Sequence, residues 1–244
     1  MRRFFSTHHD GPERLTLSAE DVKHITAVLR LRAGDEILIC DGRSTDYLCR
    51  ISEASKSNVS FDVIGSSPNP AEPGIHVTIY QGLPKSDKMD LIVQKCVELG
   101  VFAMVPVECE RSVAKIKYSS TKKTARWQSI AEAAAKQSGR GIIPTVGPVI
   151  SLDEALLQMA SYDTALMPYE LERTTSLQRA LKACRDVSSL ALFIGPEGGI
   201  SHKEAERAKA AGIVPVSLGR RILRCETAGF TALILSLALI GDYE

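Results

Sequence analysis

The sequence predicts a mixed α/β protein with two domains, and two features carry this prediction. From residue 75 onward, short apolar runs alternate with segments of helical periodicity, which is typical of a mostly parallel sheet covered on both faces. Before residue 66, short β-rich runs are separated by turn residues. Residues 66–74 lie between these regions and contain three prolines in six residues, which discourage both helix and sheet. We therefore expect domains over residues 1–70 and 75–244.

The first domain is expected to be a small barrel with one helix. Its strands are predicted at residues 36–40, 47–51 and 59–64. The helix begins at Ser18, which forms a capping pair with Asp21, and the apolar residues that follow recur on one face until Gly34 ends the segment.

The second domain is expected to alternate strands and helices. Strands are predicted at residues 75–81, 101–107, 145–149, 164–167, 190–194 and 214–218, and helices at 87–99, 121–137 and 226–240, with others between. The last helix is apolar almost all the way round, so it must be buried on every side. A subunit interface would supply one wall, which predicts a homodimer. The alternative is a central helix within a single chain.

One strand-end loop is rich in glycine. The apolar run at residues 192–194 is followed by the turn Gly195-Pro196-Glu197-Gly198-Gly199, and Ser201 with Glu204 then forms a capping box for a helix. Such a turn presents bare N–H and C=O groups to a flat ligand. It lacks the lysine of a phosphate-binding loop and is not GxGxxG, which argues against a nucleotide-dependent oxidoreductase. The alternative is a plain strand-to-helix turn.

A second strand-end loop is rich in arginine. Leu218-Gly219 ends a strand, and Arg220, Arg221 and Arg224 then alternate with Ile222 and Leu223 before Glu226-Thr227 opens the last helix. Arginines beside an apolar pair are suited to hold an anionic polymer near an apolar pocket. A solvated surface is the alternative. In open α/β sheets, ligands bind at such strand ends.

These residues carry a family resemblance. IGPEGGIS paired with LGRRILRCETA resembles the cofactor-binding region of the SPOUT methyltransferases, which are trefoil-knotted RNA methylases that use S-adenosylmethionine. More narrowly, the chain resembles the bacterial small-subunit (16S) ribosomal RNA uracil-N3 methyltransferase family. Further motifs extend the likeness over most of the chain: HITAVLRLRAGDEI, KSDKMDLIVQKCVELGV, ERSVAK and WQSIAEAAAKQSGR.

The resemblance implies an N-terminal PUA-like RNA-binding barrel and a SPOUT domain with a C-terminal knot over about residues 190–240. It also implies a homodimer that acts on small-subunit ribosomal RNA or on the assembled subunit. The expected cofactor-binding residues are Leu166, Met167, Ile194, Gly195, Pro196, Glu197, Gly198, Gly199, Leu218, Gly219, Ile222, Leu223 and Thr227. Another RNA target, either a ribose 2′-hydroxyl or a tRNA base, and a non-catalytic assembly factor are the alternatives.

The chemistry requires a uracil N3 to lose its proton. Arg224 or Arg221 is expected to stabilise the developing anion. Glu197 or Glu226 would accept the proton if burial raises its pKa. Glu226 has a purely structural alternative, because a helix N-terminus favours a carboxylate. No general base is assigned.

Basic residues are candidates for RNA contact. Residues 85–140 hold eleven Lys and Arg against six Asp and Glu, although such stretches are usually solvated. The candidates are Arg2, Arg3, Arg30, Arg32, Lys85, Lys88, Arg111, Lys115 and Arg140.

Several classes are excluded by composition. The six cysteines are scattered without a CxxC pair, and His8-His9 lacks partner ligands, so neither a metal site nor a disulfide framework is predicted. The N-terminus has no signal-peptide core, and the most apolar stretch is too short to span a bilayer. We therefore expect a cytoplasmic protein.

Overall fold

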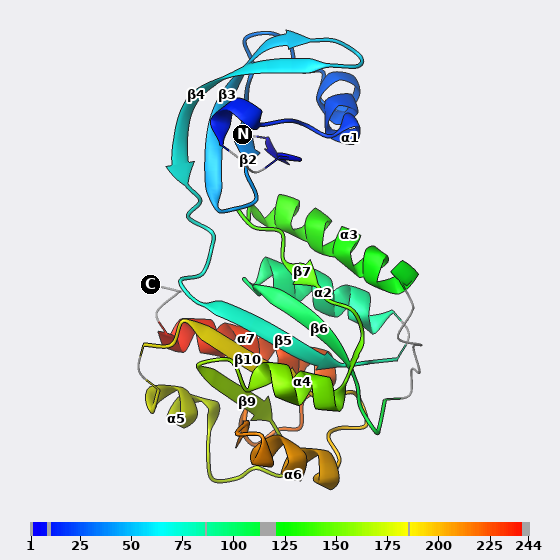
Figure 1. Cartoon of the computed structure of the whole chain (residues 1–244), viewed down its shortest axis with the longest axis vertical. Helices are drawn as coiled ribbons and strands as arrows, with labels where there is room; N and C mark the ends of the chain where they lie inside the picture. Colours follow the sequence, from blue (N-terminus) through cyan, green and yellow to red (C-terminus); the bar gives the residue numbers. More distant parts are fainter. Residues whose placement is uncertain (1, 9–10, 86, 113–120, 185, 241–244) are drawn as a thin grey trace. The chain divides into compact units, whose positions relative to one another are not determined.

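A computed structural model describes residues 2–8, 11–85, 87–112, 121–184 and 186–240 (Figure 1). The chain divides into two compact units. The first contains residues 1–72 and 135–143, and the second contains residues 73–134 and 144–244. The segment 135–143, which the sequence pattern places in the second half, is therefore part of the first unit.

The first unit contains a four-stranded sheet in the order β1-β2-β3-β4. The parallel pair is β1 (Arg3–Phe5) with β2 (Glu36–Cys40), and the antiparallel pairs add β3 (Thr45–Ala54) and β4 (Val59–Pro68). The sequence pattern missed β1, which has only three residues. It was also wrong to exclude the proline-rich segment from the sheet, since Pro68 pairs with Thr45. Proline is tolerated there because β4 is an edge strand.

The predicted helix of the first unit is present but short. A 3₁₀ turn (Pro12–Arg14) precedes α1 (Ala19–Lys23), which continues into a π-helical turn (His24–Val28). The Ser18 side chain caps α1 by accepting a hydrogen bond from the backbone N–H of Asp21, as predicted. The core of this unit is formed by apolar residues of the sheet and helix, including Phe4, Ile25, Ile37 and Ile39.

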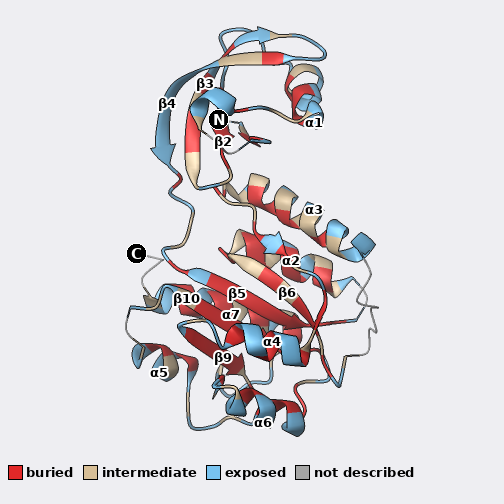
Figure 2. Cartoon of the chain, viewed as in Figure 1, coloured by how far each residue is buried: buried red, intermediate tan, exposed pale blue. Residues whose placement is uncertain are grey.

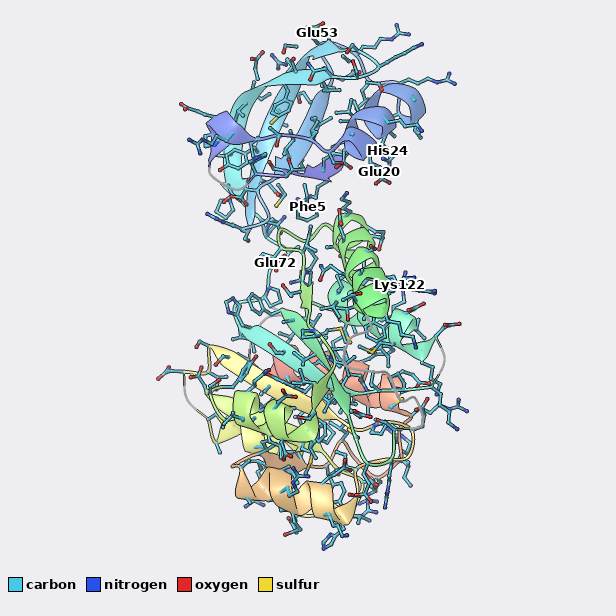
Figure 3. The ribbon with its side chains drawn as sticks, turned by 45° about the vertical axis from the view of Figure 1, so that its right-hand side comes forward. Phe5, Glu20, His24, Glu53, Glu72 and Lys122 are labelled. Carbon is cyan, nitrogen blue, oxygen red and sulfur yellow. The ribbon has the colours of Figure 1, made fainter. Side chains whose placement is uncertain are left out.

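A buried polar network joins residues 135–143 to the sheet of the first unit. The Arg140 guanidinium pairs with Glu72, which Figure 3 labels, at 2.7 Å (Nη2 to Oε2). Glu72 Oε1 also accepts the backbone N–H groups of Gly141 and Ile142 at 2.7 and 3.0 Å. Arg3 pairs with Asp46 and donates to the Gly139 carbonyl at 2.6 Å.

The second unit is built on a sheet in the order β11-β9-β10-β5-β6-β7, with β8 also paired to β6. All of these pairings are parallel. The strands are β5 (His76–Gly82), β6 (Ala103–Glu108), β7 (Thr145–Val146), β8 (Ile150–Ser151), β9 (Thr164–Pro168), β10 (Ser189–Ile194) and β11 (Val214–Val216). Of the predicted strand 145–149, only residues 145–146 form a strand, β7, and residues 147–149 separate it from β8.

Helices cover both faces of this sheet. They are α2 (Lys88–Glu98), α3 (Thr121–Ser138), α4 (Leu152–Met159), α5 (Leu177–Lys182), α6 (His202–Ala210) and α7 (Cys225–Ile240). Phe193 packs in a cluster with residues of α4 and α6, whereas the next residue, Ile194, faces Gly229 of α7. Figure 2 shows that the strands are buried and that α4 and α6 expose their outer faces.

The expectation that α7 is buried on every side is wrong for a single chain. It packs against α2, α5, β5 and β10, but Ile234, Leu235 and Leu239 are 37–40% exposed. Within the described residues, no helix is both long and apolar enough to cross a membrane.

Candidate active site

The second unit contains a pocket of about 540 Å³ at the carboxyl ends of β9, β10 and β11. The strand register explains why these ends meet. Ile194 is level with Gln81 at the end of β5, and Val216 is level with Pro168 at the end of β9. The glycine turn, the arginine loop and the segment after β9 therefore converge on one place.

Most of the predicted cofactor residues line this pocket. They are Ile194, Gly195, Pro196, Glu197, Gly198, Gly199, Leu218, Gly219, Ile222 and Leu223, together with the predicted catalytic Arg221 and Arg224 and with Lys88. Three others do not line it. Leu166 and Met167 are fully buried in β9, and Thr227 lies exposed on α7.

A third segment of the pocket wall was not predicted from the sequence. Pro168 at the end of β9 and Tyr169, Glu170 and Arg173 after it line the pocket. Other lining residues not predicted are Ile200, Ser217, Arg220, Cys225 and Ala228. A signal for the third segment was available, because it directly follows a predicted strand whose neighbours both end in ligand-type loops.

The glycine turn requires glycine for close packing. A Cβ at Gly195 would lie 2.8 Å from Ile200 Cγ1, and a Cβ at Gly198 would lie 2.8 Å from Arg111 Cβ. Gly199 has φ of +71° and donates its N–H to the Pro196 carbonyl at 2.9 Å. The predicted capping box between Ser201 and Glu204 then starts α6. The turn is thus fixed at both ends.

Three basic residues, Lys85, Lys88 and Arg111, contact the glycine turn. The Glu197 carboxylate accepts the Lys85 backbone N–H at 3.1 and 3.2 Å, and the Lys88 ammonium lies 3.1 Å from it. Lys88 Nζ also lies 3.5 Å from Glu226 Oε2. On the other side, Arg111 Nη1 donates to the Gly198 carbonyl at 3.1 Å. Three predicted RNA contacts therefore hold the turn.

The condition under which Glu197 or Glu226 would accept the proton, a pKa raised by burial, is not met. Partial burial works to raise the pKa of Glu197, but hydrogen bonds from its own backbone N–H, Lys88 and Lys85 outweigh it, so the pKa is lowered. The pKa of Glu226 is also lowered, because its own N–H, the Cys225 thiol and Lys88 outweigh its burial. Burial and the hydrogen bond to Glu226 raise the pKa of Cys225 to about 12. Both carboxyls are therefore ionised near neutral pH, and the thiol is protonated.

The arginine loop is open to solvent. Arg220, Arg221 and Arg224 are exposed, and their guanidinium groups form no ion pair within the described part of the chain. Ile222 between them is 85% exposed. Gly219 has φ of +117°, which turns the chain from β11 into this loop. The loop thus presents positive charge beside an apolar surface at the pocket.

The remaining predicted RNA contacts differ in exposure. Arg2, Arg30 and Arg32 are exposed, and Arg30 has φ of +54°. Arg3 and Arg140 instead form ion pairs with Asp46 and Glu72 inside the first unit, and Arg140 is 2% exposed. The prediction that these two residues contact RNA phosphates is therefore wrong. Lys115 lies outside the described residues.

Comparison with known proteins identifies the family. The family model described as an RNA methyltransferase domain matches residues 71–237, and the model described as an RNA methyltransferase PUA domain matches residues 17–64. Ribosomal RNA small subunit methyltransferase E of Bacillus subtilis is 38% identical over 226 residues, which are 89% of this chain and 87% of that protein. This chain belongs to the ribosomal RNA small subunit methyltransferase E family. The predicted resemblance is confirmed, and the chain is an RNA methyltransferase.

Solved structures of similar proteins show the same fold. The Neisseria gonorrhoeae methyltransferase E, bound to S-adenosyl methionine, matches with a TM-score of 0.85 at 33% identity over 100% of both chains. A putative methyltransferase from Legionella pneumophila, in complex with the same cofactor, matches with a TM-score of 0.83 at 29% identity over 97% of this chain and 96% of that one. The predicted combination of a PUA domain with a parallel-sheet methyltransferase domain is confirmed.

Proposed function

We propose that this chain transfers a methyl group from S-adenosylmethionine to N3 of one uracil in 16S ribosomal RNA of the small subunit. One observation carries the proposal: in a chain of the methyltransferase E family, the glycine turn and the arginine loop meet at a single pocket. The substrate is small-subunit RNA, either free or in the assembled subunit.

The residues of the pocket fit this cofactor. A volume of about 540 Å³ lies within the range of small-molecule sites. Backbone groups of the glycine turn and of residues 218–223 would hold the adenosine, with Ile194, Leu218 and Leu223 as apolar walls. When bound, the cofactor supplies an electrophilic sulfonium methyl group.

Arg221 and Arg224 are proposed as the catalytic residues. Both line the pocket without an ion pair among the described residues, so their charge is available to stabilise a uracil that loses its N3 proton. Glu197 is removed from the catalytic role expected of it. A carboxylate with a lowered pKa is a poor proton acceptor, and Lys85 and Lys88 engage it. We assign Glu197 to positioning the turn.

The first unit is proposed to hold the RNA as a PUA-like barrel. Arg2, Arg30 and Arg32 would contact phosphates, which position RNA without reading its sequence. The exposed apolar residues of α7 support a homodimer, since a second copy would cover them. We also propose the trefoil knot over residues 190–240, which is consistent with α7 packing back onto β5 and β10, and a cytoplasmic location.

Mapping the methylated nucleotide tests the proposal. Small subunits from cells that lack this methylation are incubated with the chain and labelled cofactor, and the labelled nucleotide is identified by mass spectrometry. One N3-methyluridine is expected. A labelled ribose, or label only in added tRNA, would favour another RNA target, and absence of label would favour an assembly factor.

Replacement of Arg224 tests its role. Arg224→Ala is expected to lower kcat by roughly 10²-fold, the effect of removing one preorganised charge at a developing anion, with an unchanged melting temperature. Arg179→Ala on the outside of α5 is the control and should leave kcat unchanged. Wild-type turnover by Arg224→Ala would remove this residue from the site.

A further inference from the structure

The turn after β9 contributes two charged side chains that the proposed function leaves without a role. Glu170 and Arg173 both line the pocket, and both are exposed. Neither side chain forms a hydrogen bond or ion pair within the described part of the chain. Their charges are therefore available to a ligand.

The turn that carries these two residues is rigidly held. At one end, the Tyr169 N–H donates to the Val216 carbonyl at 3.0 Å, and at the other the Ser217 N–H donates to the Thr175 carbonyl at 2.8 Å. Between them, Glu172 Oε1 accepts the N–H groups of Thr174 and Thr175 at 2.6 and 2.9 Å. A turn fixed in this way preorganises the side chains that it presents.

Glu170 lies directly against the glycine turn. A Cβ at Gly199 would lie 2.8 Å from Glu170 Oε1, so the carboxylate occupies the space that a side chain at position 199 would need. Glycine at 199 therefore admits a carboxylate to the pocket wall, in addition to allowing the positive φ of this residue.

The other charges of the pocket leave these two groups a distinct task. The second carboxylate of the lining, Glu197, is already engaged by Lys85 and Lys88. Glu170 is thus the lining carboxylate with open acceptor positions, and Arg173 brings a guanidinium to the same wall. A carboxylate and a guanidinium that line the same pocket without pairing with each other match a ligand that carries an ammonium and a carboxylate on one carbon.

We propose that Glu170 binds the α-ammonium group, and Arg173 the α-carboxylate, of the amino-acid end of S-adenosylmethionine. The pair makes the site specific for a zwitterionic tail in addition to the adenosine. This inference rests on the proposed function, because it requires that the pocket holds this cofactor.

Calorimetry with three related ligands tests the assignment. S-adenosylhomocysteine carries the complete amino-acid end, decarboxylated S-adenosylmethionine keeps the amine alone, and 5′-methylthioadenosine lacks both groups. Glu170→Gln should bind the first two roughly tenfold or more weakly, which is the usual loss of a charge-assisted hydrogen bond. Arg173→Gln should weaken only S-adenosylhomocysteine. Both variants should bind methylthioadenosine like the wild type.

Controls separate this inference from the proposed function. Glu206→Gln, on the outer face of α6, should bind all three ligands normally, and Glu170→Asp should recover part of the lost affinity if Glu170→Gln loses thermal stability. Equal loss for methylthioadenosine would place Glu170 on the ribose and overturn the assignment, as would no loss for any ligand. A wild type that binds none of the ligands would instead refute the proposed function.

Discussion

At position 197 a carboxylate lies 3.1 Å from the Lys88 ammonium, which also approaches Glu226. The hydrogen bond to Glu197 raises the pKa of Lys88, and the same contact helps to lower the pKa of Glu197. Three charges are therefore ionised together beside the glycine turn. Glu197, a candidate base from the sequence, therefore holds the glycine turn in place, because Lys85 and Lys88, which follow β5, contact its carboxylate.

Replacing Lys88 by methionine should weaken this hold on the glycine turn. The pKa of Glu197 is expected to rise toward its ordinary value, and affinity for S-adenosylhomocysteine to fall about two- to fivefold, as for a partly exposed ion pair. Lys95→Met on the same helix, where Lys95 pairs with Glu98 at 2.8 Å, is the matched control. Titration calorimetry compares the two. Equal affinities in both variants would contradict this role of Lys88.

The lowered pKa of Glu197 also fixes the sign of the pH effect. Its charge pair contributes above the ordinary carboxyl pKa, and the contribution is lost as pH falls through the lower pKa of the folded state. The affinity advantage of the wild type over Lys88→Met should therefore shrink as the pH is lowered through this range.

At the scale of elements, the pocket depends on the alignment of β9 with β10. At the amino ends of these strands, Asp163 Oδ2 accepts hydrogen bonds from the Ser188 hydroxyl and N–H, at 2.7 and 3.0 Å. It also accepts hydrogen bonds from the Ser189 N–H and hydroxyl, at 2.9 and 3.0 Å. These hydrogen bonds, those of Ser188 first, lower the pKa of Asp163 to about 2. One carboxylate therefore joins the starts of the two strands.

Asp163→Asn should lower stability in a pH-dependent way. Because the folded-state pKa is depressed, the stabilisation is complete above pH about 4 and is lost as the pH falls toward 2. The difference in urea midpoint between wild type and Asp163→Asn should thus be constant from pH 5 to 8 and vanish toward pH 2. Asp62→Asn on β4 should show no such difference. A difference that is independent of pH would refute this role of Asp163.

Elements whose signals are local could be predicted from the sequence. The caps at Ser18 and Ser201 involve residues three positions away, and both were predicted and are present. The partners of Arg140 and Lys88 lie 68 and 109 positions away, at Glu72 and Glu197, and no local pattern identifies them. Charge type was therefore predictable at these positions, whereas the role of each charge was not.

At the scale of the whole molecule, α7 leaves large apolar side chains exposed on the surface of a single chain. One side of this apolar helix packs against β5 and β10, whereas Ile234, Leu235 and Leu239 remain 37–40% exposed. Monomeric proteins rarely expose a row of large apolar residues. The homodimer that we propose would bury it.

Leu235→Glu should therefore convert a dimer into a monomer in sedimentation equilibrium, because a buried unpaired carboxylate at an interface costs several kcal/mol. Leu157 of α4 is 77% exposed, and Leu157→Glu is the matched control that should remain dimeric. A monomeric wild type, or a dimeric Leu235→Glu variant, would contradict the interface.

We propose that the turns after β9, β10 and β11 enclose the methyl donor. A crystal structure of this chain soaked with S-adenosylhomocysteine tests it most directly. We expect the ligand between residues 195–199 and 218–223, with its amino-acid end at Glu170 and Arg173. Ligand density elsewhere, or turns that remain filled by the protein's own side chains, would contradict it.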